Sequence, residues 1–345
     1  MSNGSGEPSD TMRARVPENR AKLWFLMEAN RWLVAGMLLA IFFFALVVLG
    51  ALDPSLIRGT MANKDPTETL FQAFVTAIIT GVTLVVTLNQ LVLSQELGPI
   101  GDQRERMEGA MQFQADVEDT LDTPVSPAEP ARFLQSIIEA TGERAHRLAD
   151  GLSGDLTDDE REEITRFTDS VTENADEVAD RLDDAQFGTF DVLSAALDFN
   201  YSWKVYEARR IQNTYDEQLG EDANDALDQL REALTFFGPA REHFKTLYFQ
   251  WELINLSRAM LYAAVPALIV ATASIIYLDA NAVLGTFLGL DNLIWVVSAA
   301  AAISVVPFVI LLAFIMRIAT VAKHTLSIGS FILRDTEGSH KTGGN

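Results

Sequence analysis

Seven polar residues recur at helical spacing within one apolar stretch of the chain, about Leu70 to Ser94. They follow one another at steps of three or four: Gln72, Thr76, Thr80, Thr83, Thr87, Gln90 and Ser94. This spacing places all seven on one face of an α-helix, opposite apolar side chains. Neutral hydroxyl and amide groups can replace part of an ion's hydration shell without trapping the ion. The pattern therefore makes these seven residues candidates to line a pore, if several copies of the helix surround one axis.

The same pattern also has a packing interpretation. Threonine and serine hydroxyls can bond back to the backbone carbonyl four residues earlier in a helix. Small polar residues also let neighbouring membrane helices approach closely. The sequence alone leaves the pore and the packing interpretations open.

No other constellation in the sequence predicts chemistry. The chain has no cysteine, which excludes disulfides and thiolate catalysis. Its histidines are too far apart for metal-ligand spacing: His146, His243, His324 and His340. No P-loop, nucleophile elbow or zinc-protease pattern occurs. We therefore expect no catalytic residue, no metal, no cofactor and no enzyme activity.

Four apolar runs predict transmembrane helices. They cover Trp32 to Leu52 and, approximately, residues 70–94, 259–278 and 293–316. None contains an ionisable side chain, and about 20 apolar residues are enough to cross about 30 Å of hydrocarbon. The absence of charge within these runs argues against pumps, antiporters and voltage sensors. The predicted fold class is all-α and integral to the membrane, with the four helices arranged as two plus two.

Basic residues predict the orientation of these helices in the cell membrane. They precede the first and third runs and follow the second and fourth: Arg13, Arg15, Arg20, Lys22, Arg31, Arg104, Arg106, Arg241, Lys245, Arg258, Arg317, Lys323 and Arg334. The opposite ends carry only Arg58 and Lys64. Because positive charge marks the cytoplasmic side, we expect a multi-pass protein with both termini and the central block in the cytoplasm.

The central block carries almost all of the excess negative charge. Between Glu96 and Glu252 there are 37 acidic and 14 basic residues. Phosphate contact needs clustered Lys and Arg, so we expect no nucleic-acid partner. Either the carboxylates solvate the surface in a salt-rich cytoplasm, or they bind cations or a basic partner. The composition resembles that of halophilic archaea, and the chain is similar in this to an uncharacterised haloarchaeal four-span membrane protein.

Five segments follow from this pattern. They are a tail and lead-in helix (1–30), two spans (31–95), an acidic cytoplasmic helical domain (96–256), two spans (257–317) and a cytoplasmic tail (318–345). Within the helical domain we predict helices over 102–121, 126–149, 157–185, 190–219 and from 222, the last interrupted near Gly238-Pro239. Ser126 and Thr157 are predicted helix caps, each with Glu three residues later.

Two prolines lie inside the third and fourth spans. Pro266 and Pro307 each remove a helical hydrogen bond, so both are helix-kink candidates. A kink of this kind can be a gating hinge or a fixed bend. The first proline lies within Ala263, Ala267 and Ala271, whose small side chains predict close helix contacts.

The order of elements is similar to that of bestrophin-type anion channels. Both have two spans, a cytoplasmic helical block and two more spans, over about residues 30 to 320 here. The resemblance implies a homo-oligomer, a pentamer in that family, with the second transmembrane helix lining the pore. This sequence departs from the family pattern below the pore helix, where it reads LNQLVLSQELGPIGDQRERMEG. Acidic residues at the ends of the spans favour cations instead of anions: Asp53, Asp65, Glu96, Asp279 and Asp291.

Two functions are compatible with these observations. The first is a homo-oligomeric passive ion channel in the lipid bilayer, with the second span lining the pathway. The second is a membrane-anchored scaffold or signalling component whose cytoplasmic helical domain binds protein partners. The predicted external loops are short, which leaves little room for an extracellular receptor in either case.

Overall fold

The computed structural model describes residues 25, 29–52, 58–59, 61, 64–153, 156–183, 185 and 190–325. These residues are mostly helical, with one two-stranded hairpin. The chain divides into two compact units. The span unit comprises residues 19–99 and 249–321, and the helical unit is built around residues 100–248.

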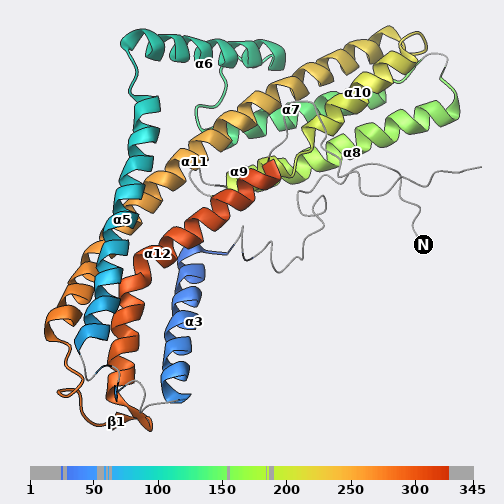
Figure 1. The fold of residues 1–345 in the computed structure, drawn as a ribbon. Helices are drawn as coiled ribbons and strands as arrows, with labels where there is room; N and C mark the ends of the chain where they lie inside the picture. Colours follow the sequence, from blue (N-terminus) through green and yellow to red (C-terminus); the bar gives the residue numbers. More distant parts are fainter. Residues whose placement is uncertain are drawn as a thin grey trace, which may run out of the picture. The chain divides into compact units, whose positions relative to one another are not determined.

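The span unit contains the helices that are long and apolar enough to cross a membrane. They are α3 (Arg31–Leu52), α5 (Lys64–Glu96), the second half of α11 (Glu221–Tyr277) and α12 (Asn292–Thr325). Figure 1 shows α3 beside α12 and α5 beside the later part of α11. The prediction of four helices with this capacity is confirmed.

One apolar cluster joins all four helices of the span unit. Val34 of α3, Val85 of α5, Met260 of α11 and Phe314 of α12 belong to it, each with at most 5% of its surface exposed. A second cluster joins α5, α11 and α12 through aromatic and alanine side chains. Burial of such surface against neighbouring helices fixes which face of each helix is turned inward.

The connection between α11 and α12 contains the hairpin. Strands β1 (Thr286–Phe287) and β2 (Leu290–Asp291) pair antiparallel, with Phe287 opposite Leu290. Leu288 and Gly289 form the turn, and both have positive φ angles of 53° and 79°. Two positive φ angles in a two-residue turn match the twist of an antiparallel pair.

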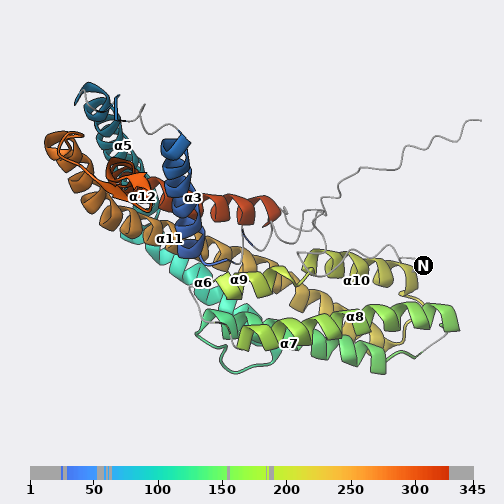
Figure 2. The same cartoon turned by 90° about the horizontal axis from the view of Figure 1, so that it is seen from below.

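The helical unit contains α6 (Ile100–Leu121), α7 (Pro130–Asp150), α8 (Asp158–Asp183), α9 (Phe190–Leu197), α10 (Tyr201–Tyr215) and the first part of α11. Figure 2 shows α7 and α8 side by side. Their amphipathic faces supply much of one large apolar core, including Leu134, Ile138, Ile164 and Val171. Gly142 allows the close approach, because a Cβ there would lie 3.2 Å from the Cβ of Ala175.

The predicted cap at Thr157 is confirmed. The backbone N–H of Thr157 donates to the Glu160 carboxylate at 2.8 Å, and the Glu160 N–H donates to the Thr157 hydroxyl at 3.4 Å. The predicted cap at Ser126 is wrong. Helix α7 starts at Pro130, and Glu129 accepts the N–H groups of its first turn. Ser126 instead donates from its backbone N–H and its hydroxyl to Glu118 of α6.

The predicted helix over 190–219 is two helices. The chain leaves the helical path between α9 and α10 because partners from α8 hold Asp198 there. Arg181 donates to the Asp198 carboxylate at 2.6 Å, and the Asn174 amide donates to the Asp198 carbonyl at 3.1 Å. These bonds compensate for the lost helical ones.

The predicted interruption near Gly238-Pro239 is absent, since α11 runs through both residues. Gly238 has a packing role instead. A Cβ at this position would lie 2.8 Å from Cε2 of Tyr201, so glycine makes room for that ring. The Tyr201 ring packs beside Phe237 and under the Arg241 guanidinium, whose Cζ lies 4.7 Å from the ring centroid.

Candidate functional site

One face of helix α5 is buried, and this face fixes the orientation of the helix. Phe71, Ile78 and Val85 recur every seventh residue, and each has at most 2% of its surface exposed. The first two pack against the small side chains Ala267 and Ala271 of α11. Aromatic and branched side chains of α5 thus fill the space that alanines of α11 leave open.

The seven predicted pore-lining residues lie on the other side of α5. At about 100° per residue, their mean direction is roughly opposite to that of the buried face. All seven are exposed in the single chain: Gln72, Thr76, Thr80, Thr83, Thr87, Gln90 and Ser94. Helix α5 therefore carries one face into its own bundle and leaves the polar face uncovered by the rest of the described chain.

The hydroxyl groups of the polar face bond back to their own helix. Thr76, Thr80, Thr83 and Thr87 each donate to the carbonyl four residues earlier, at 2.8–3.0 Å. Ser94 donates to the carbonyl three residues earlier, at 2.7 Å. A hydroxyl has one donor and two acceptor lone pairs. Because these five hydroxyl donors are directed inward, the hydroxyl groups present a row of oxygen acceptors on the outward surface of this face.

The two glutamines near the ends of this face differ from the hydroxyls. Among the described residues the side-chain amides of Gln72 and Gln90 form no hydrogen bond. An amide that faces hydrocarbon without a partner costs several kcal/mol, on the order of 4–8 by transfer to cyclohexane. The polar face thus needs water or another polar surface at both ends.

Acidic groups at the predicted outer end of the spans are partly neutralised. Arg58 donates to both carboxylate oxygens of Asp291, at 2.7 and 2.8 Å. This pairing, with a further bond from the Leu293 N–H, holds the pKa of Asp291 below its ordinary value. Asp65 is exposed, whereas the Asp279 carboxylate accepts the backbone N–H of Asn281. Asp53 lies outside the described residues, and so does the side chain of Glu96.

A buried charged cluster lies at the other end of the span unit. Arg31, at the start of α3, forms an ion pair with Glu252 of α11. The Glu252 residue is fully buried, and its Oε1 has no partner among the described residues. The guanidinium of Arg31 also lies over the ring of Phe314, 5.0 Å from its centroid. This pair links the start of α3 to the middle of α11, 221 positions away in the sequence.

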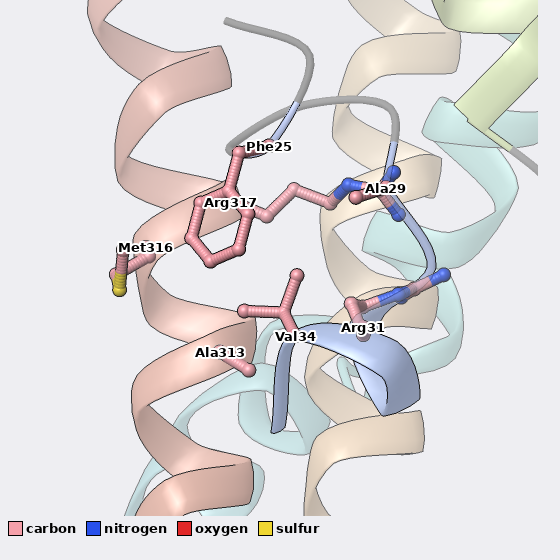
Figure 3. Close-up of a pocket in the computed structure, with 7 residues that line it drawn as sticks. All are labelled: Phe25, Ala29, Arg31, Val34, Ala313, Met316 and Arg317. Atoms are coloured by element: carbon pink, nitrogen blue, oxygen red, sulfur yellow. The ribbon is translucent and has the colours of Figure 1, made fainter. Parts of the chain in front are cut away.

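A small cavity adjoins this cluster. Figure 3 shows Arg317 extending from α12 toward Ala29, with the ring of Phe25 beside it. Arg317 is only 5% exposed. The cavity volume is about 10 Å³, which is room for roughly one water molecule. The cluster therefore joins α3, α11 and α12, and the cavity beside it is too small for a substrate.

Comparison with known families matches residues 1–344 to a family of unknown function, DUF7972. The chain belongs to this family. No curated protein and no solved structure matches it significantly.

The two helix-kink candidates of this DUF7972 chain lie inside unbroken helices. Helix α11 continues through Pro266 and α12 continues through Pro307. Figure 1 shows that α12 bends along its length. The assignment of kinks to the two prolines stays a prediction.

The charged cluster is the feature of this DUF7972 chain that sequence reasoning missed. From the sequence, Arg31 and Arg317 count only as positive charges that flank apolar runs. The signal that pointed to pairing was Glu252, an acidic residue that lies between the basic residues Lys245 and Arg258, just before the third apolar run. An acid at this place needs a cation close to the same membrane surface.

Proposed function

We propose that this DUF7972 protein is a homo-oligomeric, passive ion channel of the cell membrane, with the polar face of α5 lining the pathway. The observation that carries the proposal is the exposure of all seven polar side chains in the single chain. A polar stripe that its own bundle leaves uncovered faces lipid unless another copy or water covers it. Several copies arranged around an axis would give the two glutamine amides and the hydroxyl row a polar environment.

The direction of the hydroxyl groups favours cations. Each threonine of the stripe donates its proton to its own helix, so oxygen lone pairs face the pathway. Oxygen acceptors substitute for the hydration shell of a cation, whereas an anion needs donors. Of the acidic residues at the span ends, Asp65 adds an exposed carboxylate that acts in the same direction.

The proposal includes a topology. It assigns the helical unit and both termini to the cytoplasm. Along the sequence, the helical unit lies between the two pairs of spans. The support is the distribution of Lys and Arg around the four apolar helices. The dense carboxylates of the helical unit then serve as a hydrated surface in a salt-rich cytoplasm, as expected of a halophilic source.

Ion flux from proteoliposomes tests the channel. We expect K⁺ efflux from the wild type and a several-fold lower efflux from Thr80→Val/Thr83→Val. Valine keeps the shape of threonine and removes only the hydroxyl. Thr320→Val is the matched control, because its hydroxyl also bonds back to its own helix, at 2.7 Å to the Met316 carbonyl, but lies on α12.

Three results would refute the channel. They are no flux from the wild type, equal flux from the α5 double variant, and a monomer by light scattering in detergent. Equal loss in Thr320→Val would assign the effect to helix packing and not to the pathway.

A second candidate function is supported by an apolar groove in the helical unit. The groove has a volume of about 520 Å³. Apolar side chains from α6, α7 and α11 line it, among them Met107, Met111, Phe113, Phe133 and Phe244. Met107 and Met111 are 67% and 62% exposed. Such a groove suits the apolar face of a partner helix, as a scaffold would require.

Photo-crosslinking from the full-length protein tests the scaffold. A crosslinking residue at Met111 should capture one specific cytoplasmic protein in cells. The control position is Glu105, which is exposed on another face of the same helix. Capture from neither position, or the same products from both, would count against the scaffold.

A further inference from the structure

The connection between α11 and α12 exposes apolar side chains at its tip. Leu284, Phe287 and Leu288 are 70%, 60% and 77% exposed. No charged residue occurs between Asp279 and Asp291. A loop in contact with water alone would ordinarily carry polar side chains at these positions.

Leucine is also a costly choice for the turn. Leu288 occupies the first position of a two-residue turn with φ of 53°, a conformation that favours asparagine or glycine. The backbone therefore gains nothing from leucine there. A benefit must come from what the Leu288 side chain contacts outside the described chain.

Side chains from outside the hairpin satisfy the backbone of the connection. Arg58, Asn292 and Trp295 donate to four of its carbonyl groups at 2.9–3.2 Å. The acceptors are the backbone oxygens of Ala280, Val283, Leu284 and Phe287. A loop in water has no need of such donors, because water supplies them. Irregular backbone close to hydrocarbon does need them.

Aromatic contacts tie the hairpin to the apolar surface of the spans. The ring of Phe287 lies 5.9 Å from that of Trp295, which lies 6.1 Å from that of Phe43. Phe43 is inside α3, in a stretch that is apolar up to its end at Leu52. The adjacent end of α11 exposes Tyr277, at 79%. The exposed tip is thus continuous with the outward surface of the helices that cross the bilayer.

We propose that the hairpin of residues 284–291 inserts its tip into the boundary between lipid headgroups and hydrocarbon, beside α3 and α12. Aromatic and aliphatic side chains with a hydrogen-bonded backbone are the chemistry that this layer accepts. The ion pair with Arg58 neutralises the Asp291 carboxylate at the base of the hairpin. The inference rests on the proposed crossing of the membrane by these helices and is independent of ion conduction.

A single-cysteine experiment tests the insertion, and the natural absence of cysteine makes the labelling specific. Leu288→Cys carries an environment-sensitive nitrobenzoxadiazole label in proteoliposomes of the full-length protein. We expect blue-shifted emission, quenching by lipids with a shallow nitroxide, and several-fold weaker quenching by aqueous iodide than at the control. The control is Asn281→Cys, a polar and exposed position of the same connection.

Leu284→Cys gives a second measurement from the same hairpin outside its turn, in case the label at residue 288 disturbs folding. Iodide quenching equal to that of the Asn281 label at both positions would overturn the insertion. A blue shift that grows with the protein-to-lipid ratio, without quenching by the nitroxide lipids, would also overturn it, because a second copy would then cover the tip. If the protein conducts ions but the labels report no insertion, the inserted hairpin is refuted and the channel stands. If the labels report insertion but no ions are conducted, the channel is refuted and the inserted hairpin stands.

Discussion

Removal of the buried ion pair between α3 and α11 should destabilise the span unit strongly. Glu252→Gln keeps the shape of the side chain and removes its charge. Loss of one partner of a buried pair costs about 3–5 kcal/mol, because the other charge stays buried. The side chain of Glu252 is 1% exposed, but that of Arg31 is 21% exposed and retains some hydration. We therefore expect the lower end of this range, about 3 kcal/mol.

A double-mutant cycle separates this explanation from simple packing loss. Arg31→Met/Glu252→Leu replaces the pair with apolar side chains of similar length, which is often neutral or stabilising. We expect the double variant to be more stable than Glu252→Leu or Arg31→Met alone, the two single variants of the cycle. The free energy of unfolding is measured in dodecylmaltoside micelles titrated with dodecyl sulfate and followed by circular dichroism. Additive losses in the double variant, or a loss below about 0.5 kcal/mol in both single variants, would refute the reasoning, since independent sites add to within that margin.

Three further predictions concern the helical unit. Gly238→Ala should lower the free energy of unfolding by about 1–3 kcal/mol in chemical denaturation, because the added methyl group would force the ring of Tyr201 or the backbone to move. Unchanged stability would contradict this contact. Tyr215 donates to Glu163 at 2.6 Å, which lowers the pKa of Glu163 and, by the same bond, raises that of Tyr215. The bond should therefore stabilise the fold most between pH 4.5 and pH 10.0, the ordinary pKa values of the two groups. This stabilisation is lost as pH falls through the lowered pKa of Glu163, and also as pH rises through the raised pKa of Tyr215. Glu163→Gln should flatten the acid limb of a melting-temperature profile, and an unaltered profile would sink this assignment. Glu129→Ala should lower the free energy of unfolding by about 1 kcal/mol, because the cap of α7 is lost. Ser126→Ala is the comparison, since it leaves that cap intact. A larger loss from the serine variant would reverse the assignment of the cap.

Local features of the sequence predicted local structure well. The four helices long and apolar enough to cross a membrane follow from runs without charged side chains, because a helix needs about 20 predominantly apolar residues for that length. The cap at Thr157 was predictable because both partners lie within four residues. The polar face of α5 was predictable from helical spacing alone, although its exposure in the single chain required the packing of the opposite face.

Features that depend on distant residues could not be predicted. The choice of Glu129 over Ser126 depends on Glu118, which binds Ser126 from another helix. The glycine at position 238 of α11 is explained by the ring of Tyr201, a distant residue that leaves no room for a Cβ there. The pairing of Arg31 with Glu252 joins residues 221 positions apart, and no periodicity in the sequence reports on such a contact.

The threonine hydroxyls on α5 donate to their own helix, and this has a consequence for proton conduction. Relay of H⁺ along a chain of hydroxyls requires each group to accept one hydrogen and release another to its neighbour. A hydroxyl locked to its own backbone carbonyl accepts but does not pass the hydrogen on. Acidification inside vesicles, followed with a pH-sensitive dye, should therefore lag far behind potassium movement, and a proton current of equal size would show that the hydroxyls rotate freely.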